Sequence, residues 1–471
     1  MKEQESVRLT TKIHSLDKKG SGMGLVYRDH GGNLPRKLKL NIPQTLIGEE
    51  VEVVVPNADG RRRATVMPDK ILSSHPERTA PPCPHFELCG GCVWQHWEYA
   101  GQLAYKTDFV KSHLEKQGFD PSVVRDTIGM DHPFEFRNKM EFTFSEEGKL
   151  GLHELGNFRN IIDIDTCLIS SRDMVRVMQI VSEWAEEFDL SGYDKSTHSG
   201  LLRHLRLRQS QVTGELMAAL FATERPDGDL TDAVNTLVFR LTSELETLES
   251  LMWMENKDIA DVAQAEDEDI HLLHGRTYIH EEMSGYSYRV WYDTFFQTNP
   301  AQAEKLVDLA MEMADVKDDE SMIDLFCGVG TFSLPFASRV KSLAGVEIVE
   351  SSIESAKRNA LDNDIQNTYF LASDARRGMD EVLETWGTPD LLLLDPPRSG
   401  AGGKVMRRIG RLGTGRVVYV SCNPETFADD ITWLREYGYT LKDVQPVDLF
   451  PHSAHVECVV LMSRVKVNTM F

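Results

Sequence analysis

The chain has 471 residues, of which 41% are hydrophobic and 27% charged, with 33 glycines and 19 prolines. This length predicts two to four domains, and this composition excludes collagen-like, mucin-like and wholly disordered proteins. Lysines and arginines number 51 against 74 aspartates and glutamates, and the resulting net charge of −23 argues against a protein that binds nucleic acid through an overall positive surface.

The sequence shows no sign of a membrane or secretory protein. No stretch approaches the roughly 18 consecutive apolar residues of a membrane span, and the first five residues lack the apolar core of a signal peptide. Seven cysteines are too few for a disulfide framework in a chain of this length. We therefore expect a cytoplasmic protein with reduced thiols and no membrane partner.

Charge is distributed unevenly along the chain. Residues 1–80 carry 14 basic against 10 acidic side chains, including the run Arg61-Arg62-Arg63, whereas residues 241–270 carry 10 acidic side chains and a single lysine. Opposite signs in one chain favour a side that faces a polyanion and a solvated acidic side. An ordinary acidic surface explains the pattern equally well.

The first elements expected are short β-strands between residue 7 and about residue 67. The runs Val7–Thr10 and Val51–Val55 are typical of strands, and glycines mark the turns between such runs. The turns are expected at Gly20, Gly22, Gly24 and Gly31-Gly32. This pattern predicts a small β-barrel, a fold that often binds single-stranded nucleic acid but can also be a structural cap.

Residues 83–290 have an α+β pattern, with helical stretches such as 173–188. The strands are expected at 142–144, 205–208 and 216–220. The acidic run 266–269 is expected to form an exposed turn. After Trp291 the pattern becomes strand, glycine turn, helix and strand, repeated, which predicts a doubly wound parallel sheet.

Three cysteines lie close together in the sequence, as Cys83, Cys89 and Cys92. Soft thiolate ligands suit zinc or an iron–sulfur cluster, and a fourth ligand is needed, for which Cys167 is the nearest candidate. Zinc ribbons prefer two separate Cys-x2-Cys pairs, and only one occurs here. The C-x3-C-x2-C spacing of radical enzymes is absent. The preferred hypothesis is a structural cluster, with zinc and no metal as alternatives.

The run Ser321–Phe332 is an apolar strand that enters a Gly-x-Gly turn and then a helix. Such a turn brings backbone close to a ligand, although alone it is weak evidence. A phosphate-binding loop is not supported, because Gly402-Gly403-Lys404 is followed by valine instead of a hydroxyl residue. A nicotinamide site would prefer a third glycine where Ser333 stands.

Three further apolar runs each end in an acidic residue, namely Glu347, Asp374 and Asp395. Glu347 is placed to accept hydrogen bonds from a ribose diol, and Asp374 to meet an adenine amine. Asp395 is delivered into the cleft at the carboxyl ends of the strands. These features in order predict an S-adenosylmethionine site. The alternative is that Glu347 and Asp374 cap the helices that follow them.

The run Arg416–Ser421 is another apolar strand, and Cys422 stands at its end beside the start of a helix. A helix N-terminus lowers the pKa of a thiol and favours the thiolate, so Cys422 is the candidate nucleophile. Cys327 and Cys458 fit buried, inert cysteines.

Histidines and a carboxylate precede the last strand, where Glu457 is the candidate general base and His455 its support. Carbon 5 of uracil is too weak a nucleophile to take a methyl group directly. Addition of the Cys422 thiolate at carbon 6 would turn it into an enolate equivalent. After carbon 5 has taken the methyl group, Glu457 would remove the carbon 5 proton so that the thiolate can be eliminated, and the target base would have to flip out of its RNA stack.

On these residues the chain resembles the RNA uracil-5-methyltransferase family over nearly its whole length. It is most similar to the branch with an N-terminal TRAM barrel and a four-iron, four-sulfur (4Fe-4S) cluster that modifies large-subunit (23S) ribosomal RNA. The matching motifs are Cys83-x5-Cys89-Gly-Gly-Cys92-x2-Gln95-His96, Phe136-Arg137-Asn138-Lys139-Met140, Leu202-Arg203-His204, Phe295-Phe296-Gln297-x-Asn299, Asp324-Leu325-Phe326-Cys327-Gly328-x-Gly330, Leu394-Asp395-Pro396-Pro397-Arg398, Ser421-Cys422-Asn423-Pro424 and His455-Val456-Glu457.

The resemblance implies an α/β fold with three domains. These are a TRAM (OB-like) β-barrel for RNA binding at 1–70, a central α+β RNA-binding domain with the iron–sulfur cluster at 71–290, and a Rossmann-like S-adenosylmethionine methyltransferase domain at 291–471. The implied cofactor contacts are Gln297, Phe326, Thr331, Glu347, Asp374 and Asp395. The implied nucleophile is Cys422 and the base Glu457. Thr331 stands where relatives often carry asparagine.

The resemblance also makes Cys167 the fourth cluster ligand, beside Cys83, Cys89 and Cys92. It implies RNA contacts at Arg137, Lys139, Arg203, His204 and Arg206. Basic side chains of this kind neutralise phosphates, and the alternative is an ordinary salt-bridged surface. The expected partner is RNA, with ribosomal RNA preferred and the T-loop of transfer RNA as the alternative, for a monomer without an obligate protein partner.

Two rival functions stay open. Asp395-Pro396-Pro397 is similar to the motif with which N-methyltransferases bind an exocyclic amine, but Arg398 stands where those enzymes carry an aromatic residue, and they need no cysteine nucleophile. The other rival is a non-enzymatic RNA-binding or ribosome-assembly module. The complete set of acidic residues together with Cys422 argues against it.

Overall fold

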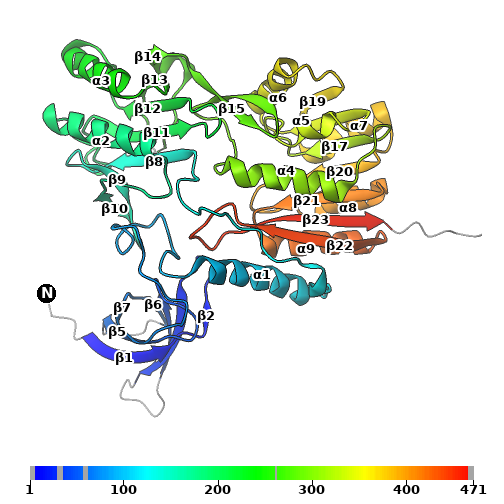
Figure 1. Ribbon diagram of the computed structural model, residues 1–471, viewed down its shortest axis with the longest axis horizontal. Coiled ribbons are helices and arrows are strands. Elements are labelled where there is room, and N and C mark those ends of the chain that lie inside the picture. Colours follow the sequence, from blue (N-terminus) through cyan, green and yellow to red (C-terminus); the bar gives the residue numbers. More distant parts are fainter. Residues whose placement is uncertain (1–5, 29–35, 57–61, 260–261, 465–471) are drawn as a thin grey trace, which may run out of the picture. The chain divides into compact units, whose positions relative to one another are not determined.

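The computed structural model describes residues 6–28, 36–56, 62–259 and 262–464 (Figure 1). The chain forms two compact units. The first comprises Met1–Tyr105, His153–Ile162 and Phe450–Ala454, and the second comprises Lys106–Leu152, Asp163–Leu449 and His455–Phe471. Domain boundaries at residues 70 and 290 stay a prediction.

The N-terminal part of the first unit folds into two small sheets around one apolar core. Their strand orders are β1-β5-β7 and β2-β3-β4-β6. The strands are β1 (Ser6–Lys12), β2 (Ser15–Leu16), β3 (Gly22–Arg28), β4 (Arg36–Ile42), β5 (Glu50–Pro56), β6 (Arg63–Thr65) and β7 (Pro68–Ser73). Alternate residues of β4 and β5, such as Leu40 and Val53, are fully buried in that core, as the period of two in a strand requires.

The glycines of this segment differ partly from expectation. Gly20 lies in a turn with φ +86°, a conformation that suits glycine. Gly22 and Gly24 instead belong to strand β3. Only glycine fits at these two positions, because a Cβ would come 2.0 Å from a threonine side chain at Gly22 and 2.7 Å from one at Gly24. The turn predicted at Gly31-Gly32 and the side chain of Arg61 lie outside the described residues.

An aromatic cluster holds the rest of the first unit together. The rings of Trp94, Trp97 and Tyr105 pack edge to face, and Trp94 lies in a buried apolar cluster with Leu46. The backbone N–H of Trp94 also donates to the carbonyl oxygen of His452 at 3.0 Å. The segment 450–454 is thereby bound to this unit, although it lies near the C-terminus of the sequence.

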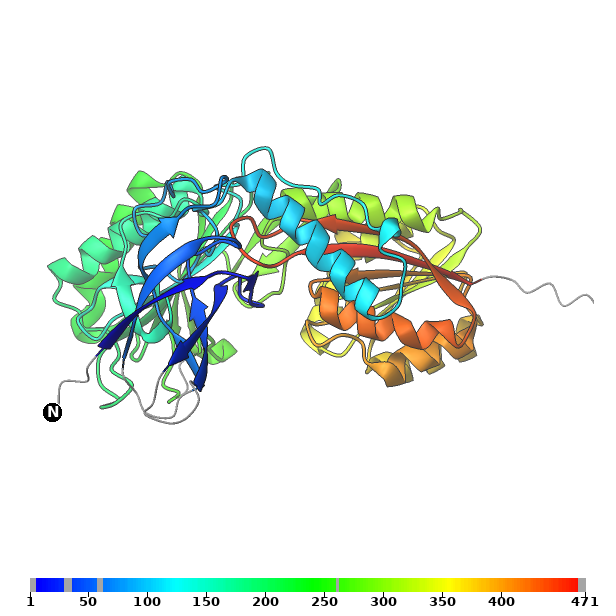
Figure 2. The same cartoon turned by 90° about the horizontal axis from the view of Figure 1, so that it is seen from below.

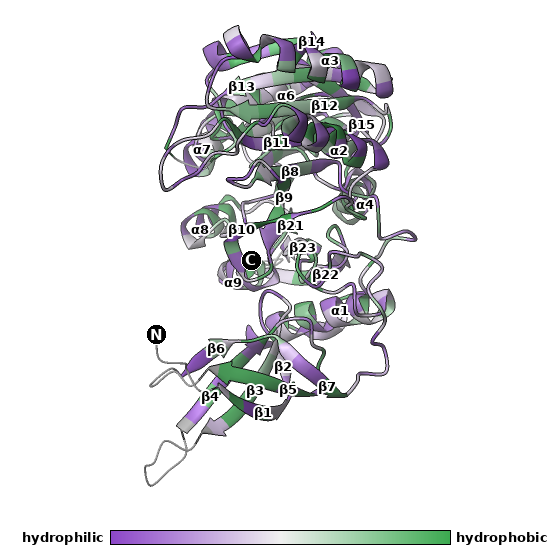
Figure 3. Cartoon of the chain, turned by 90° about the vertical axis from the view of Figure 1, so that its left-hand side faces the viewer, coloured by the Kyte–Doolittle hydropathy of each residue, from purple (hydrophilic) through white to green (hydrophobic). Residues whose placement is uncertain are grey.

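A seven-stranded sheet with the order β10-β9-β8-β11-β12-β13-β14 follows along the chain. Its strands are β8 (Lys139–Phe144), β9 (Leu150–Glu154), β10 (Asn157–Asp163), β11 (Leu202–Gln209), β12 (Leu216–Ala222), β13 (Leu248–Glu255) and β14 (Ile270–Gly275). The continuous apolar run of β12 is buried at every residue, and Figure 3 shows this strand in green. Helices α2 (Arg172–Glu187) and α3 (Thr231–Glu244) pack on the sheet.

These elements confirm the α+β prediction for the middle of the chain. The predicted helix 173–188 is α2. Its N-cap is Ser171, whose hydroxyl oxygen accepts a hydrogen bond from the N–H of Met174. The acidic run at 266–269 forms a short 3-10 turn, Asp267–Asp269, just before β14. A hairpin of β15 (Tyr278–Met283) and β16 (Tyr286–Trp291) then leads to the C-terminal part of the second unit.

The C-terminal part is a doubly wound sheet, as predicted. Its strand order is β19-β18-β17-β20-β21-β23-β22, and every neighbouring pair is parallel except those that involve β23. The strands are β17 (Ser321–Leu325), β18 (Ser342–Glu347), β19 (Thr368–Ala372), β20 (Leu391–Leu394), β21 (Arg416–Ser421), β22 (Tyr439–Val447) and β23 (Glu457–Arg464).

Helices cover both faces of this sheet. They are α4 (Pro300–Ala314), α5 (Ser333–Ala337), α6 (Glu350–Asp362), α7 (Ala375–Trp386), α8 (Gly403–Leu412) and α9 (Pro424–Arg435). Figure 2 shows α4, in yellow-green, on one side of the red strands β22 and β23, with the orange pair α8 and α9 on the other.

The core of this sheet includes residues from far earlier in the sequence. Val110 and Leu114 of helix α1 (Tyr99–Lys116) and Val124 after it are buried in the same cluster as the C-terminal strands. Val124 also forms a parallel bridge with Val444 of β22. Within the described ranges, none of the helices combines the length and apolar character needed to cross a membrane.

Truncation of Leu393, a residue of β20 with 0% exposure, should destabilise this sheet. Leu393→Ala removes buried methyl groups and leaves a cavity, so the free energy of unfolding should fall by roughly 2 to 5 kcal/mol. The measurement is urea unfolding beside the matched variant Leu361→Ala, whose side chain on α6 is 66% exposed. Equal midpoints for the two variants would contradict the buried placement of Leu393.

Candidate active site

The carboxyl ends of the parallel strands bring most of the predicted site residues to one edge of the C-terminal sheet. Strand β18 ends at Glu347, while Asp395 directly follows β20 and Cys422 directly follows β21. Strand β23 runs antiparallel to β21 and begins at Glu457, and Ser421 pairs with Cys458. The first residue of β23 therefore lies beside the residue that follows β21.

The turn after β17 has the backbone geometry of a ligand cradle. Phe326 has φ +64°, which is rare for a residue with a side chain, and its N–H donates to the carbonyl oxygen of Val346 at 2.8 Å. Gly328 has φ +53°, and a Cβ there would meet nothing within 4 Å. The turn therefore presents bare backbone to open space at Gly328.

Asp324 is a buried carboxyl group of this site to which the sequence analysis gave no role. Its Oδ2 accepts a hydrogen bond from the Ser333 hydroxyl at 2.5 Å, while its buried Oδ1 has no partner among the described residues. Burial, followed by the charges of Asp395 and Glu347, raises the pKa of Asp324 to about 7. An acidic residue inside an otherwise apolar strand was the signal in the sequence.

The two acidic residues predicted to contact a nucleoside both accept backbone hydrogen bonds. Glu347 Oε1 accepts from the N–H groups of Ile348 and Val349 at 2.7 and 3.0 Å, which lie before the first residue of α6. Asp374 is the N-cap of α7, and its Oδ1 accepts from the N–H of Arg376 at 3.0 Å. The capping role weighed from the sequence is therefore present at Asp374, whereas no side chain among the described residues caps α6.

Backbone contacts hold the remaining two predicted cofactor residues. The Gln297 carbonyl oxygen accepts from Asn138 Nδ2 at 3.1 Å, and the Thr331 carbonyl oxygen accepts from the Tyr288 hydroxyl at 3.4 Å. A hollow of about 910 Å³ adjoins the turn that follows β17. Its lining includes Val329, Val349, Phe295, Trp291, Arg289 and Arg358.

Cys422, Glu457 and Asp395 influence one another electrostatically. Burial raises the pKa of Glu457 to about 8, and the charge of Asp395 adds to this. Burial, then the charges of Glu457 and Asp395, raises the pKa of Cys422 to about 12. The prediction of a lowered thiol pKa was wrong for this state of the protein, because burial and two carboxylates outweigh the start of α9.

Arg398 is the nearby cation that opposes these carboxylates. Its charge lowers the pKa values of both Cys422 and Glu457. Its Nη2 lies 2.5 Å from His455 Nδ1. Burial, followed by the charges of Arg398 and Lys106, lowers the pKa of His455 to about 4. His455 is therefore neutral at pH 7 and supports the site by its contact with Arg398.

The other two cysteines of the C-terminal sheet are inert by position, as predicted. Cys327 is 6% exposed and Cys458 is 0% exposed, and burial raises the pKa of each thiol. Cys458 lies within β23, whereas Cys327 lies in the turn after β17 and not inside a strand.

Comparisons with known proteins agree with this geometry. A family model described as tRNA (Uracil-5-)-methyltransferase matches residues 235–465. An uncharacterized RNA methyltransferase of Caldanaerobacter subterraneus is 34% identical and the match covers 97% of this chain and 98% of that protein. Another, of Halalkalibacterium halodurans, is 36% identical, with 90% and 92% covered.

A solved structure shares the fold. The crystal structure of Pyrococcus abyssi tRNA (uracil-54, C5)-methyltransferase in complex with S-adenosyl-L-homocysteine superposes with a TM-score of 0.74 at 27% identity, covering 96% of this chain and 100% of that one. This chain belongs to the RNA uracil-5-methyltransferase family. It is an S-adenosylmethionine-dependent RNA methyltransferase.

The residues of this methyltransferase fit its cofactor. The bare backbone at Gly328, the unpartnered Oδ1 of Asp324 and the carboxylate at the end of β18 all lie at the carboxyl edge of the sheet. Doubly wound sheets bind their ligands at this edge. Backbone and carboxylate groups at this edge can hydrogen-bond the polar groups of a nucleoside with an amino-acid tail.

The methyltransferase's predicted RNA contacts do not all reach solvent. Arg203 is 1% exposed, and its guanidinium donates to oxygens of Asn256 and Asp258. His204 is 3% exposed and its Nδ1 lies 3.2 Å from the Thr143 hydroxyl. The prediction that these two side chains contact phosphates was wrong, because the fold places both inside the central sheet.

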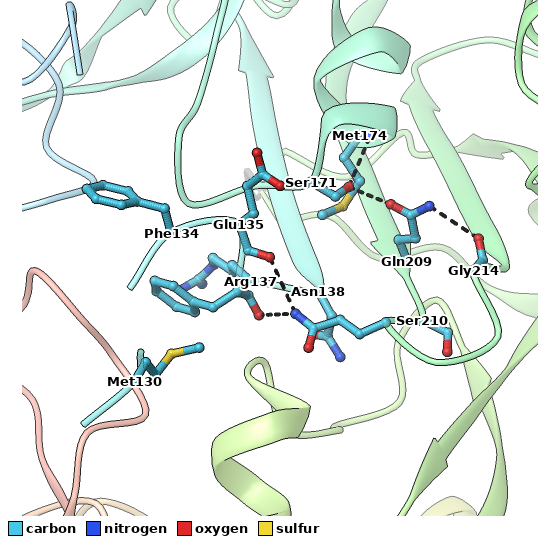
Figure 4. Close-up of a pocket in the computed structure, with 12 residues that line it drawn as sticks. Met130, Phe134, Glu135, Arg137, Asn138, Ser171, Met174, Gln209, Ser210 and Gly214 are labelled. Atoms are coloured by element: carbon cyan, nitrogen blue, oxygen red, sulfur yellow. Dashed lines mark hydrogen bonds between the residues drawn. The ribbon is translucent and has the colours of Figure 1, made fainter. Parts of the chain in front are cut away.

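Several basic side chains lie on strands β8 and β11 or just before β8. Burial, followed by the charges of Arg208, Arg206 and Arg137, lowers the pKa of Lys139 to about 8. Arg206 is 9% exposed and donates to Glu141 Oε2 at 2.8 Å, so its predicted phosphate contact was wrong for the same reason. A pocket of about 360 Å³ opens next to Arg137 and is shown in Figure 4. Its lining includes Met130, Phe134, Asn138, Gln209 and Ser210.

The three-cysteine motif (Cys83, Cys89 and Cys92) lies in the first unit and Cys167 in the second. All seven cysteines are among the described residues, and none forms a disulfide. Within those residues no group of three or more histidine, cysteine, aspartate or glutamate side chains is arranged around a common metal position. The Cys89 sulfur accepts a hydrogen bond from the Gly91 N–H at 3.3 Å.

The raised pKa of Glu457 makes a prediction about stability. Between the ordinary glutamate pKa of 4.5 and about 8, the unfolded chain releases this proton and the folded methyltransferase retains it. The free energy of unfolding should therefore fall as pH rises through this window, by at most about 1.4 kcal/mol per pH unit from this group.

Glu457→Gln removes the titration, so its melting temperature should exceed that of the wild type increasingly from pH 5 to pH 8. Differential scanning calorimetry at several pH values measures this. The control is Glu354→Gln, which changes a carboxylate that is 68% exposed and should show no such trend. A difference for Glu457→Gln that is constant with pH would contradict the burial of an ionisable carboxyl group there.

Proposed function

We propose that this enzyme methylates carbon 5 of one uridine in large-subunit (23S) ribosomal RNA through a covalent bond between Cys422 and carbon 6. The observation that carries the chemistry is the placement of Cys422 and Glu457 at one edge of the sheet, within electrostatic reach of each other. The resemblance to the TRAM-barrel, iron–sulfur branch supports ribosomal RNA as substrate.

The second candidate substrate is the T-loop uridine of transfer RNA. It is favoured by the name of the Pyrococcus abyssi protein, a tRNA (uracil-54, C5)-methyltransferase. The chemistry is the same for either RNA, so the two candidates differ only in which RNA the enzyme recognises.

The residues that would hold S-adenosylmethionine are those of the turn after β17 and of the neighbouring strand ends. They are Gln297, Phe326, Thr331, Glu347, Asp374 and Asp395. Bound S-adenosylmethionine supplies the methyl group that carbon 5 takes. The unpartnered Oδ1 of Asp324 would accept a further hydrogen bond in the same region.

Cys422 carries the covalent step. Its sulfur bonds to carbon 6 of the uracil, and the electron pair of the carbon 5–carbon 6 double bond moves onto carbon 5 and the neighbouring carbonyl. The thiol must first lose its proton. Arg398 favours the thiolate, because its positive charge lowers the pKa of Cys422 against the effects of burial and of Glu457.

Glu457 completes the reaction as general base. Once carbon 5 carries the methyl group, the Glu457 carboxylate takes the carbon 5 proton, the double bond between carbons 5 and 6 forms again, and the carbon–sulfur bond breaks to release Cys422 as a thiolate. A pKa of about 8 favours the protonated form of Glu457 at pH 7, and a base must be deprotonated. Arg398 therefore acts here as well, because its charge lowers the pKa of Glu457 and favours the carboxylate.

The RNA surface that we propose lies around Arg137 and Lys139, which are both partly exposed. The charge of Arg137 contributes to the lowered pKa of Lys139, and like charges held together bind a polyanion that neutralises them. The exposed Arg62 and Arg63 of the N-terminal segment would add to phosphate binding. The enzyme is proposed to act as a monomer in the cytoplasm.

We propose in addition that Cys83, Cys89, Cys92 and Cys167 hold a 4Fe-4S cluster. The donor set supports this, because thiolates are the ligands of such clusters and none of the four is in a disulfide. The hydrogen bond from the Gly91 N–H to the Cys89 sulfur is of the kind that stabilises a cluster thiolate. The bound cluster would cross-link the segments that carry its ligands.

Incubation with labelled S-adenosylmethionine and separate pools of unmodified ribosomal and transfer RNA tests the function. Label should appear as 5-methyluridine at one position of large-subunit ribosomal RNA. Cys422→Ala should still bind S-adenosylmethionine but lose turnover entirely, and Cys458→Ala is the matched control, since it removes a cysteine outside the mechanism. The same nucleoside from transfer RNA alone would replace the substrate. Label on an exocyclic nitrogen would overturn the chemistry.

Anaerobic purification followed by iron and sulfide analysis tests the cluster. We expect about four iron and four sulfide ions per chain, as in cysteine-ligated 4Fe-4S proteins. Cys89→Ser should lose both, whereas Cys327→Ser, which changes a buried cysteine of the C-terminal sheet, should retain them. Stoichiometric zinc in place of iron would refute the assignment.

A further inference from the structure

A buried ion pair lies outside the residues assigned to catalysis. Lys106 is 1% exposed and Asp448 is 0% exposed, and Lys106 Nζ lies 2.6 Å from Asp448 Oδ1. Burial lowers the pKa of Lys106, while the Asp448 carboxylate opposes that shift. Desolvation of two charges often cancels their attraction, so such a pair is weak evidence for stability and better evidence for a fixed arrangement.

Asp448 is held on its backbone as well as its side chain. Its N–H donates to the carbonyl oxygen of Ile128 at 2.8 Å, and its own carbonyl oxygen accepts from Gln302 Nε2 at 2.9 Å. The next carbonyl, that of Leu449, accepts from Asn299 Nδ2 at 3.0 Å. Contacts from α4 and from the segment after α1 therefore anchor this one point.

The anchored point lies directly beyond the strand pair that carries Glu457. In the pairing of β22 with β23, Val447 is opposite Glu457, and Asp448 is the first residue after β22. The end of a strand pair opens most readily unless the chain beyond it is fixed. The same end of β23 sets Glu457 beside Cys422, because Ser421 pairs with Cys458.

The charge of Lys106 also reaches the segment that leads into β23. After burial and Arg398, it contributes to the lowered pKa of His455, which lies two residues before Glu457. The pair is therefore close to the site without belonging to the groups that face Cys422.

We infer that Lys106, through Asp448, is a positioning residue for Glu457. It holds Glu457 where its carboxylate can reach the carbon 5 proton of the uracil that is bonded to Cys422. This inference rests on the proposed function. Its loss should slow the step that Glu457 performs and leave cofactor binding and thiolate addition intact. A misplacement of about 1 Å can cost about 100-fold in rate.

The variant Lys106→Met retains most of the length of the side chain and removes its charge. With labelled S-adenosylmethionine and RNA, it should accumulate a methylated covalent protein–RNA adduct that survives a denaturing gel, with release of product slowed by about 100-fold and the Kd for the cofactor unchanged. Rates are normalised to the cofactor-binding sites in each preparation, so that unfolded protein does not count.

The matched control is Arg125→Met. It removes an ion pair between the segment after α1 and β22, that of Arg125 with Asp443, which is partly exposed, and it should release product at the wild-type rate. The double variant Lys106→Met/Asp448→Leu leaves no unpaired buried charge and should still accumulate the adduct, since the anchor is absent.

Glu457→Gln is the reference for a disabled base. If it accumulates the methylated adduct and the two Lys106 variants do not, the positioning role is refuted while the proposed function stands. If Glu457→Gln turns over normally, both the role of Glu457 and that of Lys106 are overturned.

Discussion

The site depends on one reversal of chain direction. Strand β23 runs antiparallel between β21 and β22, so its first residue lies at the edge where the parallel strands end. A parallel β23 would begin at the opposite edge of the sheet, roughly 20 Å away for a strand of six residues. Cys422 follows β21 and Glu457 is the first residue of β23, and this reversal brings the two residues together.

The electrostatics of the site follow from the same crowding. Asp324, Asp395 and Glu457 share one edge of a buried sheet, and burial raises the pKa of each to about 7 or 8. Of these three groups, Glu457 is the one whose pKa the charge of Arg398 lowers. Because an opposite charge favours the carboxylate, a bound sulfonium cation would lower these pKa values.

Much of the architecture was readable from the sequence. Apolar runs with the right length and ending predicted the doubly wound sheet, and the acidic strand ends predicted Glu347 and Asp395 at one edge. Local pattern failed where tertiary packing decides. Gly22 and Gly24 look like turn glycines, yet they serve close packing inside β3. Arg203 looks like a phosphate contact in sequence, yet the fold buries it.

The thiol of Cys422 shows the same limit. Its neighbour in sequence is a helix start, which lowers a pKa, but Asp395 and Glu457 are distant in sequence and raise it more, together with burial. The ion pair of Lys106 with Asp448 joins residues 342 positions apart. No spacing rule connects such residues, because the contact exists only once the sheet has formed.

The early residues in the core of the last sheet have a consequence for synthesis on the ribosome. Val110, Leu114 and Val124 leave the exit tunnel long before β22 and β23, against which this segment packs. Until β22 has emerged, Val124 lacks Val444, its partner in the parallel bridge. Part of this apolar segment is therefore uncovered during elongation, a period in which chaperones would hold it.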